Sequence, residues 1–168
     1  WVPWQGIEPA RQPRFAHNTS GRFESRWVTV KIQPSPALMF KDMAGLVFGI
    51  HLDHGEGRLH FPDPAILRQV EAGSMTPLVY VDDHGEATEA YPFTPSGSPD
   101  GQADLCSPDG RHLALLPHPE PAFLPCPLPY LLESMHVYTA SPMLNSCMNA
   151  YECCLHGLDR LSLRTHSG

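Results

Sequence analysis

At 168 residues the chain is long enough for one domain with a hydrophobic core. Its composition, with 42% hydrophobic and 17% charged residues, is typical of a globular protein and not of a disordered one. A formal net charge of -7, with no cluster of lysine or arginine, argues against a nucleic-acid partner. No apolar run reaches the roughly 18 to 20 residues that cross a bilayer. We therefore expect no membrane association and, without a secretory signal, a cytoplasmic location.

Nineteen prolines divide the chain into short pieces, which favours strands and loops over long helices. Alternating apolar and β-branched residues predict a strand over 27–32. A more continuously apolar run predicts a second strand over 46–52, of the kind buried on both faces. Shorter strands are expected over 59–61 and 78–81.

Two helices are predicted from their end signals. The first spans 65–71, with Asp63 as its N-cap, Pro64 in its first turn and Gly73 at its end. The second spans 141–155, with a serine cap followed by a proline in the first turn.

The segments 103–106 and 111–116 flank the turn sequence Ser107-Pro108-Asp109-Gly110, a pattern that predicts a β-hairpin. All the predicted elements together indicate one α/β or α+β domain over residues 1–168. Secondary structure alone does not indicate a function.

Two further groups of polar residues have simple interpretations. The five cysteines are odd in number and lack zinc-ligand spacing, so we expect reduced thiols and no metal site. Arg22, Glu24 and Arg26 are interpreted as a charge ladder on the surface of a strand edge.

The hairpin ends in Pro117-His118-Pro119-Glu120, which holds a candidate catalytic pair. Side chains two residues apart on an extended backbone lie on the same side, so His118 and Glu120 should meet. A carboxylate next to an imidazole fixes its tautomer and stabilises the imidazolium. This pair could serve as the base and orienting residue of a nucleophile–base–orienter relay.

This ending resembles the signature of class I glutamine amidotransferases, in which the His and Glu complete a Cys-His-Glu triad. Further motifs resemble, in order and spacing, the amidotransferase end of formylglycinamidine ribonucleotide synthase: Asn18 to Trp27, His54-Gly55-Glu56-Gly57, Tyr80-Val81-Asp82-Asp83, Gly97-Ser98-Pro99 and 107–114. The resemblance is clearest over 15–120, and 121–168 form a divergent tail. It implies a class I, flavodoxin-like α/β domain, of which this chain would be the C-terminal portion, with a β-hairpin and a C-terminal helix.

The resemblance also implies roles for individual residues. His118 would be the general base and acid, and Glu120 its orienting partner. His54, Gly55 and Glu56 lie in the loop that lines the glutamine pocket in this family. Glutamine would be the substrate, and the synthetase domains of the same parent chain would be the partner. Those domains would bind ATP and magnesium, because this segment contains no phosphate-binding loop and should need no cofactor of its own.

The sequence departs from the family in two places. The elbow that carries the nucleophile, Cys-Asn-Gly-Cys-Gln or similar, does not occur, so this segment alone is predicted to be inactive. Pro121 follows the triad where the family usually has arginine.

We favour a partial sequence of a working synthase. Its glutaminase would release ammonia for the ATP-dependent conversion of formylglycinamide ribonucleotide to formylglycinamidine ribonucleotide in purine biosynthesis. The alternative is a non-catalytic relative kept as a protein-interaction scaffold. A stand-alone glutaminase subunit is a weaker third possibility, because it would also need the nucleophile.

Overall fold

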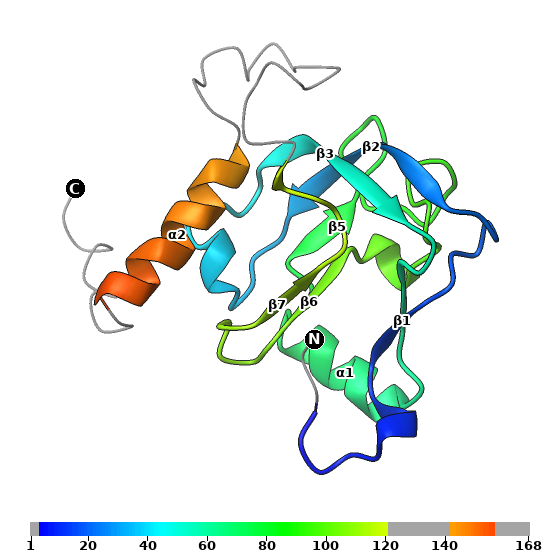
Figure 1. Ribbon diagram of the computed structural model, residues 1–168, viewed down its shortest axis with the longest axis horizontal. Helices are drawn as coiled ribbons and strands as arrows, with labels where there is room; N and C mark the ends of the chain where they lie inside the picture. The colour runs from blue at the N-terminus through cyan, green and yellow to red at the C-terminus, as the bar shows by residue number, and fades with distance from the viewer. Residues whose placement is uncertain (1–3, 121–141, 157–168) are drawn as a thin grey trace.

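The computed structural model describes residues 4–120 and 142–156, with strands at the centre and the two α-helices outside them (Figure 1). Its elements, with η for 3-10 helices, are η1 (Pro9–Arg11), β1 (Arg14–Ala16), β2 (Glu24–Ile32), η2 (Leu38–Phe40), β3 (Val47–His54), β4 (Arg58–His60), α1 (Pro64–Ala72), β5 (Leu78–Tyr80), η3 (Pro99–Gly101), β6 (Asp104–Cys106), β7 (Leu113–Leu115) and α2 (Pro142–His156). The domain therefore mixes strands and helices, as predicted.

The strands pair antiparallel in three small sheets. β2 lies between β3 and β5, β1 pairs with β4, and β6 pairs with β7, which confirms the predicted hairpin. Isolated bridges join Val79 to Gln102 and His51 to His118. Backbone pairing therefore runs from β3 through β2, β5, β6 and β7 and returns to β3. This closed circuit places the segment after β7 next to β3.

The burial of β3 corrects the prediction that 46–52 is covered on both faces. Phe48, Ile50 and Leu52 are buried, whereas Gly49 and His51 are only half-buried. Antiparallel sheets commonly bury one face and leave the other accessible. The sequence of this strand reads as continuously apolar because Gly49, which lies on the half-buried face, has no polar side chain to indicate that this face is accessible.

Helix α1 begins and ends where the sequence predicts. The Asp63 side chain accepts a hydrogen bond from the Ala65 amide at 2.9 Å, and Gly73 is the C-cap. The helix buries Ile66 and Val70 against the core. Local signals are sufficient here because capping depends on neighbours in sequence.

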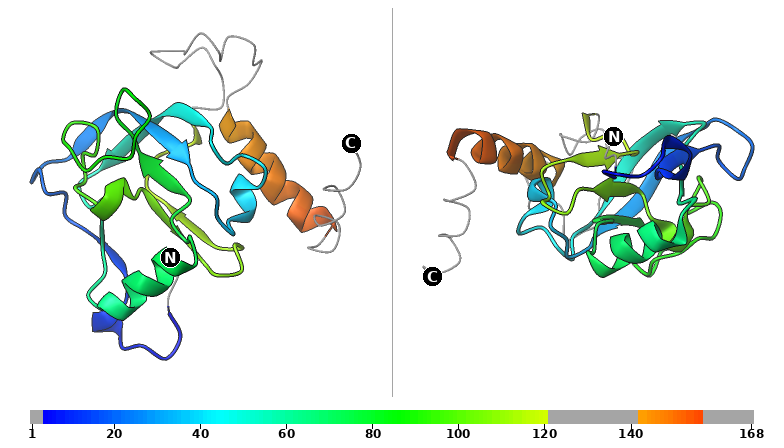
Figure 2. Two further views of the ribbon diagram at one scale, coloured as in Figure 1. Left: turned by 180° about the vertical axis from the view of Figure 1, so that it is seen from behind. Right: turned by 90° about the horizontal axis from the view of Figure 1, so that it is seen from below.

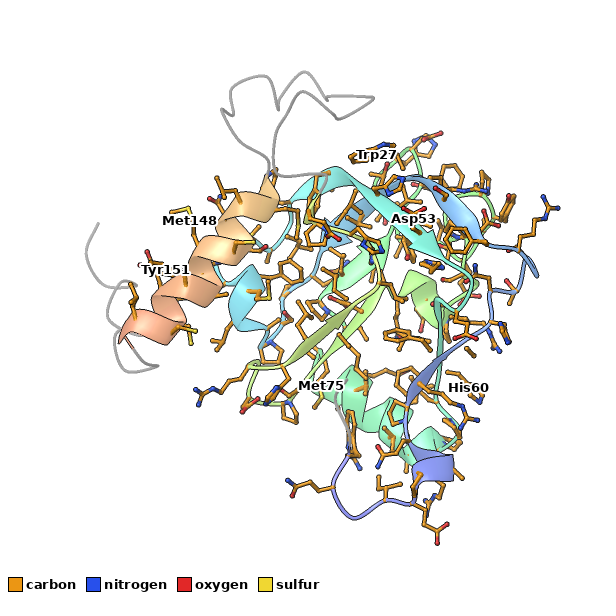
Figure 3. The ribbon with its side chains drawn as sticks, in the orientation of Figure 1. Trp27, Asp53, His60, Met75, Met148 and Tyr151 are labelled. Atoms are coloured by element: carbon orange, nitrogen blue, oxygen red, sulfur yellow. The ribbon has the colours of Figure 1, made fainter. Side chains whose placement is uncertain are left out.

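Helix α2 is also confirmed, although the predicted serine cap at 141 lies outside the described residues. The helix lies at the periphery in every view (Figures 1 and 2), and Met148 and Tyr151 stand on its exposed side (Figure 3). The Asn149 side chain donates hydrogen bonds to the carbonyls of Met39 and Lys41 at 3.1 and 2.9 Å. These bonds hold the helix against the segment at η2.

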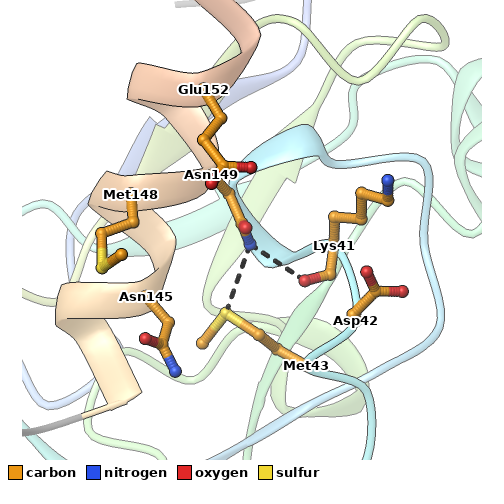
Figure 4. Close-up of a pocket in the computed structure, with 7 residues that line it drawn as sticks. All are labelled: Lys41, Asp42, Met43, Asn145, Met148, Asn149 and Glu152. Atoms are coloured by element: carbon orange, nitrogen blue, oxygen red, sulfur yellow. Dashed lines mark hydrogen bonds between the residues drawn. The ribbon is translucent and has the colours of Figure 1, made fainter. Parts of the chain in front are cut away.

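A polar pocket lies next to Asn149, between α2 and residues 41–43 (Figure 4). No predicted site residue lines this pocket. No helix among the described residues is both long and apolar enough to cross a bilayer.

Candidate active site

His118 and Glu120 meet as predicted, directly after the hairpin. His118 Nδ1 lies 2.8 Å from Glu120 Oε1. Because a carboxylate only accepts hydrogen bonds, His118 Nδ1 donates, so in the neutral ring it is Nε2 that carries the lone pair. The hydrogen bond from His118 is the main reason that the pKa of the Glu120 carboxyl lies below its usual value. The pair thus presents a basic nitrogen held by an ionised orienting residue.

The bridge to β3 fixes the position of this pair. The His118 amide donates to the His51 carbonyl at 2.7 Å, so the two residues are direct cross-strand neighbours. His51 Nδ1 in turn lies 3.1 Å from Asp53 Oδ2, which makes a second imidazole–carboxylate pair on β3. The ring of Trp27 meets His51 edge-on, with centroids 5.6 Å apart. The short segment after β7 is therefore anchored on a regular strand.

The loop 54–57 at the end of β3 is held by the buried side chain of Asn18. Asn18 Nδ2 donates to the carbonyls of His54 and Arg22 at 2.8 and 2.9 Å. Its Oδ1 accepts from the Gly57 amide at 3.0 Å and lies 3.0 Å from His54 Nδ1. The Asn18 amide also donates to the Gly55 carbonyl at 2.9 Å. One asparagine thereby fixes most of the loop backbone.

Asn18 also determines the tautomer of His54. Since Asn18 Oδ1 can only accept, His54 Nδ1 must donate, and Nε2 is left as an acceptor. Burial lowers the pKa of His54, so the ring is neutral at physiological pH. A Cβ on Gly57 would lie 2.2 Å from Cε1 of this ring, so only glycine allows the observed packing.

The structure separates the residues predicted in this loop. His54 is buried, whereas the Glu56 side chain is exposed and lies 3.6 Å from His17 Nε2. Gly55 contributes its carbonyl to Asn18. Burial is the main cause of the lowered pKa of His54, and the charge on His118 lowers it a little further.

Glu24 corrects the interpretation of 22–26 as a surface charge ladder. The residue is only 3% exposed and lies directly opposite His54 in the β2–β3 ladder. Its Oε2 pairs with Arg26, which also donates to the Tyr91 hydroxyl at 2.8 Å. The sequence pattern of β2 could have indicated this burial. Side chains alternate between the two faces of a strand, and Glu24 is four residues from the buried Val28, so both face the same side.

Comparison with known sequences decides the family. The CobB/CobQ-like glutamine amidotransferase domain matches residues 1–153. The chain belongs to this family. The amidotransferase chain is 51% identical over 159 residues to a phosphoribosylformylglycinamidine synthase of Dictyostelium discoideum, which covers 92% of the chain and 12% of that relative. The human protein of the same name is 45% identical over 141 residues, covering 84% of the chain and 10% of the relative.

The amidotransferase chain thus spans about a tenth of these relatives. A plant relative, from Arabidopsis thaliana, is 48% identical and is named as a chloroplastic or mitochondrial synthase. Among solved structures, PurLQS from Thermotoga maritima aligns with a TM-score of 0.52 at 22% identity, covering 82% of this chain and 52% of that one. At this identity the structural likeness bears on the fold alone.

Proposed function

We propose that this chain is the C-terminal portion of the glutaminase domain of a phosphoribosylformylglycinamidine synthase. The observation that carries the proposal is the hydrogen-bonded His118–Glu120 pair, anchored by the bridge to β3 next to the buried loop at His54. The similarity to synthases in several organisms supports the same function. We also propose the flavodoxin-like class I architecture for the whole domain and a cytoplasmic location for the parent protein.

The proposed chemistry assigns the proton transfers to His118. A cysteine supplied by a part of the parent outside this chain has given its thiol proton to His118 Nε2, and the resulting thiolate attacks the side-chain amide carbon of glutamine. His118 then gives a proton to the departing ammonia, and a γ-glutamyl thioester remains. Water next attacks the thioester carbon, His118 takes the proton from that water, and glutamate leaves as the thiolate is restored. Glu120 holds the ring in position and stabilises its protonated form.

The ammonia would pass to the synthetase domains of the same parent, which we propose bind ATP and magnesium. Those domains would convert formylglycinamide ribonucleotide to formylglycinamidine ribonucleotide. Within this chain, His54, Gly55 and Glu56 are proposed to line the glutamine pocket. The buried position of His54 supports its part in this assignment, whereas Glu56 would have to act from the exposed side of the loop.

The test is His118→Ala in the intact synthase. We expect glutamine-dependent synthesis to fall by roughly 10²- to 10⁴-fold, the usual range for a lost general acid–base. Synthesis from added ammonia should continue, because ammonia enters after the step that needs His118. His84→Ala, at an exposed turn, is the matched control. Equal loss of both activities would contradict the assignment of His118 to glutamine hydrolysis.

A further inference from the structure

Glu24 and His54 form a buried cross-strand pair in which each side chain has one unsatisfied atom. They are direct partners in the β2–β3 register and are 3% and 8% exposed. Glu24 Oε1 and His54 Nε2 are both shielded from solvent and make no hydrogen bond within the described part of the chain. Directly opposed residues have Cβ atoms about 5 Å apart, which puts the two side chains within reach of one small ligand group.

Both unsatisfied atoms are hydrogen-bond acceptors. Asn18 commits His54 Nδ1 as the donor, so Nε2 carries a lone pair. Glu24 Oε2 pairs with Arg26, which supplies a countercharge for the carboxylate and leaves Oε1 free. Two acceptors cannot satisfy each other, and buried unpaired acceptors are unfavourable. One group with at least two polar hydrogens would satisfy both.

We propose that Glu24 Oε1 and His54 Nε2 bind an ammonium group of the ligand. The inference rests on the proposed function, in which glutamine carries an α-ammonium and its hydrolysis releases ammonia, the two possible sources of this group. Charge-assisted hydrogen bonds from an ammonium group to a carboxylate are of the stronger kind, and Arg26 pairs with the other oxygen of Glu24, Oε2. A neutral imidazole next to this carboxylate accepts without repelling the positive charge.

The loop that follows His54 lies next to the proposed site. Both atoms are shielded from solvent, so an ammonium group reaches them only when the covering residues move; one of these is Gly57, which packs against the His54 ring. Gly55 and Gly57 have no side chain to hinder this movement, which would break the hydrogen bonds between Asn18 and the loop. His118 bridges His51 on β3, the strand that ends at His54, so the proposed site and the proton-transfer pair lie along the same strand.

The test compares two substrates in the intact synthase carrying Glu24→Gln. Glutamine is set against glutaramate, which has the same amide and carboxylate but no α-ammonium. We expect the ratio of kcat/KM for glutamine to kcat/KM for glutaramate to fall about 10- to 100-fold, the loss of one charged hydrogen bond. The ratio does not depend on the fraction of enzyme that folds. Glu86→Gln, at an exposed turn, is the control and should leave the ratio unchanged.

A second readout separates the sources of the ammonium. If Glu24 binds the released ammonium, the substrate ratio stays constant but less product forms per glutamine hydrolysed. If neither the ratio nor this coupling changes, the inference is wrong. Should Glu24→Gln fail to fold, Glu24→Asp retracts the same oxygen and gives the same two readouts. Continued glutamine use by the His118→Ala enzyme would refute the proposed function itself, whatever Glu24 does.

Discussion

Asp104 on β6 should make the stability of this domain fall as pH rises. Its side chain is completely buried, and its Oδ1 accepts a hydrogen bond from the Leu78 amide at 2.9 Å. Its Oδ2 makes no hydrogen bond with any described residue. Burial raises the pKa of Asp104 well above its usual value, and the hydrogen bond from Leu78 opposes this only in part.

The sign of the pH dependence follows from this shift. The unfolded chain loses the Asp104 proton near the ordinary pKa of 3.8, whereas the folded domain keeps it to higher pH. The contribution of Asp104 to stability is therefore full below that pKa. It falls by about 1.4 kcal/mol for each pH unit above it, until the folded pKa is reached. Asp104→Asn keeps an acceptor for the Leu78 amide but cannot ionise, so it should lack this slope.

The assay is urea unfolding of the 168-residue chain from about pH 5 to about pH 8. Wild type should lose stability with rising pH relative to Asp104→Asn, so that the variant becomes the more stable protein at the alkaline end. Asp83→Asn, at an exposed position, is the control and should follow wild type. Asp104→Ala should instead lower the free energy of unfolding by about 1–3 kcal/mol at every pH in this range, because the Leu78 amide is left without a hydrogen-bond partner. Parallel pH profiles for wild type and Asp104→Asn would refute the reasoning.

Two other predictions concern packing and thiol chemistry. Gly57→Ala would place a methyl group 2.2 Å from Cε1 of His54. We therefore expect the free energy of unfolding, measured with urea, to fall by about 1–3 kcal/mol. Glutamine-dependent turnover of the intact synthase should fall as well. Unchanged values for both would contradict the contact. Burial raises the pKa of Cys106 to about 12, whereas Cys147 and Cys154 are exposed. Alkylation near pH 8, followed by mass spectrometry, should therefore modify the two exposed thiols first and Cys106 only on unfolding; equal rates would show that the Cys106 site is open.

The elements that were predicted well depend on neighbours in sequence. Asp63, Pro64 and Gly73 act within one or two turns of α1, so their pattern sets both ends of the helix. The hairpin of β6 and β7 likewise follows from the turn sequence between its strands. The hydrogen bond from His118 to Glu120 was also predictable, since it joins residues two apart on an extended segment.

Features that join distant segments were missed or misread. Whether Glu24 faces water or His54 depends on which face of β2 is covered, and the pairing of β2 with β3 decides that. The second imidazole–carboxylate pair, His51 with Asp53, gains its place in the site only because the chain returns after β7 to bridge β3.

The sequence by itself determined the family motifs, the ends of α1, the hairpin and the contact between His118 and Glu120, because each is encoded within a few consecutive residues. Only the tertiary structure decided that Asn18 fixes the tautomer of His54, that Glu24 is buried opposite it, and that His118 lies next to β3. The physical reason is that strand register and burial arise from contacts between segments far apart in the chain. Local propensity cannot specify those contacts, whereas closing the circuit of strands does.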